Sequence, residues 1–299
     1  MTANRHHPSA ATLHHSIFAM HRFYLPPGHC AGDALRLDGR EAHHALHVLR
    51  LKRGELVTVL DGVGNEFLCA VENSSRDSVT LSVSLKNFTP PLPCSITLLQ
   101  AVPKGKIIES IIQKAVELGA HRIVPLLSER VVTHPDQDAA GDKREKWQQV
   151  AIEAIKQCGA AWMPEIETPT TIEKFLASHC SGGRPTAGLV RENEKCGPLP
   201  KAATLADFDL SLVGSLQTER RHPRECLSGF QAKHGRLPQS VGVWIGPEGD
   251  FTPEELEAIQ AAGALPVSLG RLILRVETAA IYCLSILNYE LNSVLESKL

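Results

Sequence analysis

The sequence predicts an α/β protein of two domains, a small one made of short strands and a larger one built on a parallel sheet. Apolar and polar residues alternate in short runs from residue 22 to 88, which is typical of half-buried β-strands. From residue 95 onward, apolar strand-like runs alternate with helical runs, which predicts strands joined by helical crossovers. Within residues 241–280 two strands each end in a glycine turn, and ligands bind beyond such strand ends.

Composition fits an ordinary globular protein, since 43% of the 299 residues are hydrophobic and 21% are charged. No apolar run approaches the roughly 20 residues that span a bilayer, and the N-terminus has no apolar core like that of a signal peptide. We therefore expect a cytoplasmic protein without a membrane partner. The net charge of −2 means that any RNA binding would depend on a local basic surface.

The eight cysteines are scattered without CxxC pairs, so we expect reduced thiols and neither a disulfide framework nor a zinc site. Residues 1–19 contain four histidines but no sustained periodicity. A metal-binding tract is one interpretation of these histidines. A disordered leader is the one that we favour.

Residues 20–90 are expected to form the small β domain. Asp61-Gly62 and Gly64-Asn65 predict a hairpin turn between two of its strands, and residues 40–50 predict a short helix. The ordered part is expected to begin at residues 22–25, and the predicted strands are residues 34–37, 56–61, 66–71 and 78–85. Short strands joined in this way predict a small β-barrel.

A proline-rich linker, residues 89–93, precedes the larger domain, residues 91–299. Residues 95–101 and 123–127 predict strands on either side of a helix whose isoleucines share one face, which is a β-α-β unit. Lys104-Gly105-Lys106 lacks the GxxxxGK[ST] spacing of a phosphate loop, and this absence argues against an ATPase.

Residues 142–158 predict an amphipathic helix, and residues 181–206 remain without an assignment. Between these segments, Trp162 either stacks on a nucleobase or packs beneath the next loop, and packing is favoured. Residues 209–216 predict a buried strand, and His222-Pro223 predicts the start of a helix.

The segment from 241 to 299 organises the rest of the chain. Residues 241–245 predict a buried strand, and Thr252-Pro253 with Glu255 predicts a capped helix that follows it. A second strand is predicted at 266–270, and a long helix follows Arg275. An apolar stripe on this helix is either core or a dimer seam, and its members are Ala280, Leu284, Leu287, Leu291 and Val294.

Three strand ends, at residues 214–216, 245–249 and 269–274, are expected to converge on one ligand site. Such ends offer backbone donors and acceptors bordered by aliphatic side chains, and glycines let the backbone come close to a ligand. This environment suits the edge and faces of an adenine.

IGPEG followed by LGRLILRVETA resembles the second and third motifs of the SPOUT methyltransferases, and within them those of the RsmE family. RFYL, the HHxxHVLRxxxGE pattern and PKGK resemble further elements of the same family. The resemblance implies a trefoil-knotted parallel-sheet domain behind an N-terminal PUA-like β-barrel that binds RNA. It also implies a homodimer that methylates N3 of a uridine in 16S ribosomal RNA, free or in the assembled small subunit.

The cofactor implied by this resemblance is S-adenosylmethionine, with S-adenosylhomocysteine as product and no metal. The implied cofactor-binding residues are Gly214, Ser215, Leu216, Ile245, Gly246, Pro247, Glu248, Gly249, Leu269, Gly270, Leu272, Leu274, Thr278 and Ala279. The implied RNA-binding residues are Arg22, Arg50, Lys52, Lys104, Lys106 and Arg130.

Arg275 is the candidate catalytic residue. Methyl transfer to N3 builds negative charge on the pyrimidine, and a guanidinium offers a permanent charge and a fork of donors to a uracil carbonyl. The alternative is a structural ion pair of Arg275 with Glu277 or Glu248.

The chain departs from the RsmE pattern at Ala160, where the family usually has arginine, and at Asp250, where it more often has glycine. Two other functions therefore stay open. One is a SPOUT ribose 2′-O-methyltransferase, and the other is a non-catalytic RNA-binding factor of ribosome assembly.

Overall fold

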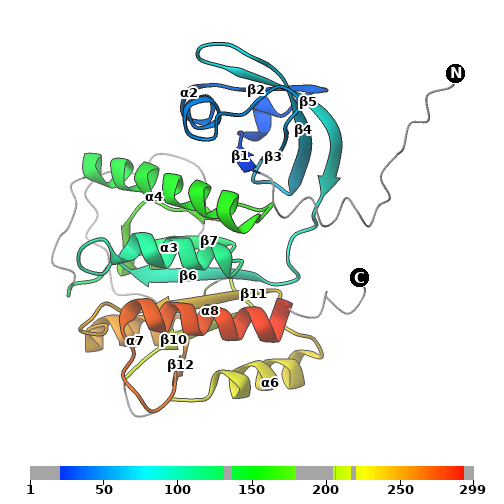
Figure 1. Ribbon diagram of the computed structural model, residues 1–299. Helices are drawn as coiled ribbons and strands as arrows, with labels where there is room; N and C mark the ends of the chain where they lie inside the picture. Colours follow the sequence, from blue (N-terminus) through cyan, green and yellow to red (C-terminus); the bar gives the residue numbers. More distant parts are fainter. Residues whose placement is uncertain (1–20, 131–136, 180–204, 206, 217–219, 293–299) are drawn as a thin grey trace, which may run out of the picture. The chain divides into compact units, whose positions relative to one another are not determined.

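The computed structural model describes residues 21–130, 137–179, 205, 207–216 and 220–292 (Figure 1). The predicted leader at 1–19, Val294, and the segment 181–206 apart from Leu205 lie outside these residues.

The chain forms two compact units. The N-terminal unit runs to Pro91 and also takes in Ile155–Met163. The C-terminal unit consists of Leu92–Ala154 and the chain from Pro164 onward. The inclusion of Ile155–Met163 in the N-terminal unit is not a feature that the sequence analysis predicts.

The N-terminal unit is a curled five-stranded sheet with strand order β1-β3-β4-β5-β2 (Figure 1). Its strands are β1 (His21–Tyr24), β2 (Ala34–Leu37), β3 (Leu56–Leu60), β4 (Asn65–Ser74) and β5 (Val79–Phe88). All pairs are antiparallel except β1 with β3. The four predicted strands are confirmed as β2 to β5, and β1, where the ordered part was expected to begin, is a fifth; β1 and β2 form the two edges of the sheet.

Successive side chains of a strand point to opposite faces of the sheet, so every second residue of β4 faces the core of this unit. Phe67, Cys69 and Val71 of β4 are buried there together with Phe23 of β1. The predicted short helix is two pieces, α2 (Gly39–His43) and the π-helix η2 (His44–Val48). A 3₁₀ turn, η1 (Pro27–His29), precedes β2.

The turn between β3 and β4 confirms the predicted hairpin. The Asp61 carboxylate, which is buried, accepts hydrogen bonds from the backbone N–H groups of Val63 (2.9 Å) and Asn65 (3.0 Å). The Asn65 side chain also donates to Asp61. An aspartate that accepts from its following backbone in this way stabilises a turn.

The C-terminal unit is built on a seven-stranded sheet in which every pair is parallel, as the β-α-β pattern predicts. The order is β12-β10-β11-β6-β7-β8, and β9 also pairs with β7. The strands are β6 (Ser95–Ala101), β7 (Arg122–Leu127), β8 (Glu165–Ile166), β9 (Thr170–Thr171), β10 (Leu210–Gly214), β11 (Ser240–Ile245) and β12 (Leu265–Val267). The trefoil knot implied by the resemblance stays a prediction.

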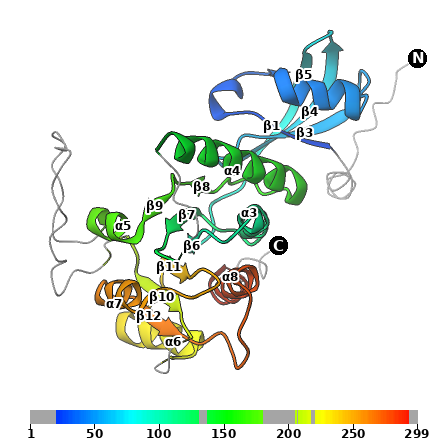
Figure 2. The ribbon, with the colours of Figure 1, turned by 90° about the vertical axis from the view of Figure 1, so that its left-hand side faces the viewer.

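Helices cover both faces of this sheet. Figure 2 shows α3 and α8 on one side, and α5 and α7 on the other. The helices are α3 (Ile107–Glu117), α4 (Gln137–Cys158), α5 (Ile172–His179), α6 (Pro223–His234), α7 (Pro253–Ala261) and α8 (Val276–Asn292). The predicted stripe on α8 is core, because Ala280, Leu284, Leu287 and Leu291 are buried.

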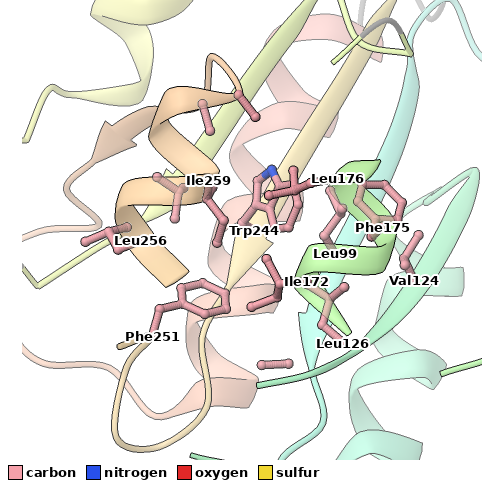
Figure 3. Close-up of a cluster of buried hydrophobic side chains, with 14 of the residues drawn as sticks. Leu99, Val124, Leu126, Ile172, Phe175, Leu176, Trp244, Phe251, Leu256 and Ile259 are labelled. Carbon is pink, nitrogen blue, oxygen red and sulfur yellow. The ribbon is translucent and has the colours of Figure 1, made fainter. Parts of the chain in front are cut away.

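Trp244 lies at the centre of the hydrophobic cluster between the sheet and α5 and α7 (Figure 3). Its side chain is fully buried, and its ring meets that of Phe175 edge to face with centroids 5.5 Å apart. The indole N–H donates to the Ser211 hydroxyl at 3.0 Å. Since Ile245 and Gly246 follow directly, this packing fixes the end of β11.

The six described cysteines are free thiols, as the sequence analysis expects. Burial raises the pKa of Cys69, Cys94 and Cys283 to about 12. These thiols therefore stay protonated near neutral pH and behave as small apolar side chains.

Candidate functional site

The carboxyl ends of β10 and β11 lie side by side in the sheet, and the chain that leaves β12 passes beside them. A cavity of about 460 Å³ opens at this edge. The three predicted segments thus converge on a concave site, as expected beyond the ends of parallel strands.

Most residues predicted to bind a cofactor line this cavity. From the end of β10 come Gly214, Ser215 and Leu216, and from the end of β11 come Ile245, Gly246, Pro247 and Glu248. From the loop after β12 and the start of α8 come Leu269, Gly270, Leu272, Leu274 and Ala279. Gly249 and Thr278 lie off the cavity wall.

Two glycines determine the shape of the wall. A Cβ atom on Gly214 would lie 3.4 Å from Ile245 Cδ1 and 3.6 Å from Leu269 Cδ1. A larger side chain at this position would therefore fill the space where the three segments meet. Gly270 has a φ of +116°, a backbone conformation that L side chains rarely adopt.

Glu255 fixes the turn that follows β11. It forms the predicted capping box with Thr252 at the start of α7, and its carboxylate also accepts the Ser128 hydroxyl and the Glu129 N–H, each at 2.8 Å. The Glu255 side chain is buried, with 4% of the residue exposed. This one carboxylate therefore joins the turn to the residues that follow β7.

Two predicted RNA-binding residues also hold this turn. The exposed Glu248 carboxylate accepts the backbone N–H of Lys104 at 3.0 Å. The Arg130 guanidinium donates to the Gly249 carbonyl. The loops after β6 and β7 thus support the backbone that forms one wall of the cavity.

Replacing Arg130 with methionine is expected to lower the free energy of unfolding by about 1 kcal/mol, because a hydrogen bond to the turn is lost. Urea denaturation would measure the change. Lys106→Met is the matched control, since Lys106 is an exposed cation on the neighbouring loop, and its effect should stay below about 0.5 kcal/mol. Equal changes in the two variants would contradict a structural role for Arg130.

Arg275 lines the cavity from the turn that leads into α8, and its side chain is exposed. Its carbonyl accepts the N–H of Ala279 at 2.8 Å, so the helix holds its backbone. Among the described residues, it pairs with neither Glu277 nor Glu248, the partners of the structural alternative. As far as the described residues go, its guanidinium therefore keeps its donors available to a ligand.

The wall also contains charged residues that the sequence analysis does not predict as site residues. Arg220 donates to the Ser215 carbonyl at 3.2 Å. Asp250 accepts the N–H groups of Phe251 and Leu216, at 2.9 and 3.3 Å. The residues missed are Ile107, Arg220, Asp250, Ile273, Val276 and Glu277. Most of them directly follow or lie within the predicted motifs, and this adjacency is the signal that would have identified them.

The predicted RNA-binding residues of the N-terminal unit differ in their surroundings. The Arg22 guanidinium donates to the carbonyls of Lys156 and Gln157, at 3.4 and 3.3 Å, where α4 ends. Arg50 and Lys52 are exposed, as are Lys104 and Lys106 in the C-terminal unit. An RNA contact of any of these residues stays a prediction.

Trp162 is packed within the N-terminal unit, which was the favoured of the two interpretations of this residue. Its indole N–H donates to the Thr89 carbonyl at 2.8 Å, and its ring meets that of Phe88 edge to face, with centroids 6.1 Å apart. These contacts occupy the ring within the N-terminal unit, so a nucleobase is not needed to explain its position.

The described residues contain no group of three or more His, Cys, Asp or Glu side chains that could hold a metal ion. Among the helices described, none combines the length and the apolar character required for a membrane span.

Two family models match the chain. One, described as an RNA methyltransferase domain, matches residues 90–288, and the other, an RNA methyltransferase PUA domain, matches residues 37–84. The chain is 32% identical to the ribosomal RNA small subunit methyltransferase E of Synechocystis sp., over 94% of this chain and 80% of that protein. It is 29% identical to the protein of the same name from Bacillus subtilis, over 85% of this chain and 89% of that one.

Solved structures match most of the chain. The ribosomal RNA small subunit methyltransferase E of Neisseria gonorrhoeae, bound to S-adenosyl methionine, matches with a TM-score of 0.70 at 25% identity, over 92% of this chain and 99% of that one. A protein of Legionella pneumophila, solved with the bound cofactor SAM, matches with a TM-score of 0.74 at 29% identity, over 91% of this chain and 98% of that one.

Proposed function

Because the chain belongs to the RNA methyltransferase family, and within it to the ribosomal RNA small subunit methyltransferase E family, we propose that it methylates N3 of a uridine in small-subunit ribosomal RNA. The methyl donor is S-adenosylmethionine. The observation that carries this proposal is the cavity at the ends of β10 and β11, whose wall contains an available arginine, Arg275.

The cavity suits a nucleoside ligand. Ile245, Leu269 and Leu274 supply aliphatic walls for a flat ring, and the strand ends supply backbone groups for its polar edge. Gly214 leaves room for close approach. The predicted cofactor residues on the wall are those that we propose to contact S-adenosylmethionine, and S-adenosylhomocysteine leaves as product.

The chemistry that the cofactor supplies is an electrophilic methyl group on a sulfonium. The protein must orient the uracil so that N3 faces this methyl, and it must stabilise the charge that grows on the base as the N3 proton leaves. Arg275 stabilises this growing charge by donating a hydrogen bond to a uracil carbonyl oxygen. A guanidinium offers a planar fork of donors that matches such an acceptor.

RNA is held by exposed cations that contact its phosphate backbone. In the C-terminal unit these are Lys104, Lys106 and Arg130, which lie beside the cavity turn or on the loop before α3. In the N-terminal unit, which matches a PUA domain, the exposed cations are Arg50 and Lys52, and the half-buried Arg22 is a third candidate contact. Flipping the target base out of its stack costs roughly a few kcal/mol, which these contacts offset.

The working form is a homodimer in the cytoplasm, acting on the free 16S RNA or on the assembled subunit. Leu272 and Ile273 are each 80% exposed at the cavity mouth, and Tyr282 and Tyr289 are exposed two turns apart on α8. Large apolar side chains left open together are typical of an association surface. A second copy of the chain would cover them.

The test is a calorimetric titration with S-adenosylmethionine, followed by a transfer assay with radiolabelled methyl groups on naked 16S RNA and on small subunits lacking the modification. Micromolar binding and a labelled nucleoside that is methylated on the base would support the proposal. Failure to bind the cofactor would overturn it. Binding without transfer would favour the non-catalytic assembly factor.

The product separates the proposal from its nearest alternative. A ribose 2′-O-methyl group blocks alkaline cleavage of the adjacent phosphodiester, whereas a methyl group on N3 does not. Alkaline digestion of the labelled RNA should therefore release a labelled mononucleotide. A labelled, alkali-resistant dinucleotide would assign the chain to the 2′-O-methyltransferases.

A further inference from the structure

Asp250 has an unusual backbone conformation at the edge of the cavity. Its φ is +63°, and Arg50 is the one other described non-glycine residue with a positive φ. Aspartate tolerates this region better than most residues but still adopts it at an energetic disadvantage relative to glycine. A conformation of this kind next to a ligand site points to a role for the side chain.

The Asp250 carboxylate is held in place from two sides. Oδ1 accepts the N–H of Phe251 at 2.9 Å, within its own turn, and Oδ2 accepts the N–H of Leu216 at 3.3 Å, at the end of β10. The residue is half-buried and lines the cavity. Its negative charge is therefore fixed on the cavity wall, not mobile in solvent.

We propose that Asp250 determines the selectivity of this cavity for the positively charged sulfonium of S-adenosylmethionine over the neutral thioether of S-adenosylhomocysteine. The inference rests on the proposed function. This selectivity speeds the replacement of bound S-adenosylhomocysteine by S-adenosylmethionine after each methyl transfer.

The dimensions of the cavity make this charge effective. A volume of about 460 Å³ corresponds to a sphere of roughly 5 Å radius, so a charge on the wall acts on a bound cation at short range. At such distances an effective dielectric constant of about 20 gives an attraction worth an order of magnitude or more in affinity.

Asp250 contributes to a net negative charge on the wall. The wall contains two arginines, Arg220 and Arg275, and three acidic residues, Glu248, Asp250 and Glu277. Glu248 is exposed, and its carboxylate accepts the Lys104 N–H. Without Asp250 the formal charges of the wall would cancel, and no net attraction for a cation would remain.

Asp250→Asn removes the charge with the smallest change in shape. Asparagine tolerates a positive φ as well as aspartate does, and its one amide oxygen still accepts one of the two backbone N–H groups. Calorimetric titration should show binding of S-adenosylmethionine weakened about ten-fold, which corresponds to about 1.4 kcal/mol. Binding of S-adenosylhomocysteine should change by less than about two-fold, because the thioether carries no charge.

Asp250→Gly removes the bridge together with the charge. Glycine accepts the backbone conformation without strain but loses both the charge and the bond to Leu216. Affinity for both ligands should then fall, and more for the sulfonium. Glu254→Gln is the matched control, since this exposed carboxylate on α7 is off the cavity wall, and its ratio of Kd values should equal that of the wild type.

An equal loss of both ligands in Asp250→Asn would overturn the inference and leave Asp250 as a structural bridge. No loss of either ligand would overturn it as well. A wild-type protein that binds neither ligand would instead refute the proposed function, so the two failures are distinguishable.

Discussion

Replacing Arg275 with alanine is expected to lower the rate of methyl transfer by about 100- to 1,000-fold, which is typical when one donor to a developing negative charge is removed. The affinity for S-adenosylmethionine should stay within about two-fold, because the guanidinium acts on the acceptor base. Single-turnover transfer to small-subunit RNA would measure the rate, and calorimetry the affinity.

Two further variants sharpen this result. Arg275→Lys keeps the charge but loses the planar fork of donors, so it should recover only part of the rate. Arg271→Ala removes an exposed arginine from the same loop, off the cavity wall, and should keep transfer near the wild-type rate. If Arg275→Ala lost cofactor affinity and transfer in parallel, Arg275 would be a cofactor contact and not the group that stabilises the base.

Replacing Glu255 with alanine is expected to lower the free energy of unfolding of the C-terminal unit by about 3 kcal/mol. The change removes the acceptor of the Ser128 hydroxyl and of the Glu129 and Thr252 N–H groups, and buried donors without partners are costly. Urea denaturation followed by tryptophan fluorescence would report the loss, since Trp244 is buried in this unit.

Glu255→Gln should fall between alanine and the wild type, because one amide oxygen replaces two carboxylate oxygens. Glu257→Ala, an exposed change on the same helix, should stay within about 0.5 kcal/mol. A loss below about 0.5 kcal/mol in Glu255→Ala would mean that the loop after β7 and the cavity turn are held together by other contacts.

Local sequence patterns predict the strands and most helices of this fold. Every strand of the N-terminal sheet except β1 was expected, and so were β6, β7, β10, β11 and β12, because their apolar runs are bounded by turn residues. The elements β8, β9 and α5 were not expected. β8 and β9 have two residues each, too few for a period to appear, and α5 has only eight.

The part of the cavity that the ends of the strands form could be predicted from the sequence. Parallel strands bring their carboxyl ends to one edge, so the glycine turns at Gly214 and Gly246 were expected at the same edge, and the pairing of β10 with β11 makes them neighbours. The charged wall could not be predicted in this way. The contacts of Asp250 and Arg220 depend on how each turn directs its side chains, and spacing along the chain does not fix this direction.

Tertiary packing also determines what Arg22 does. In the sequence it is one basic residue among several, and its guanidinium proves to contact the carbonyls at the end of α4. The last turn of that helix groups with the N-terminal unit, a pairing that joins residues more than a hundred positions apart. No local pattern contains information of this kind.

The order of strands in the parallel sheet has a consequence for folding. β6 is made early, yet its partner on one side is β11, where Ser240 pairs with Ser95. During synthesis the edge of β6 therefore stays open until residue 245 has left the ribosome. Contacts of such long sequence separation slow folding, because a long loop must close first. We expect a slow refolding phase in which the cavity is the last part to form. We also expect that a nascent chain needs the open edge of β6 to be covered early, because an unpaired strand edge can pair with another chain.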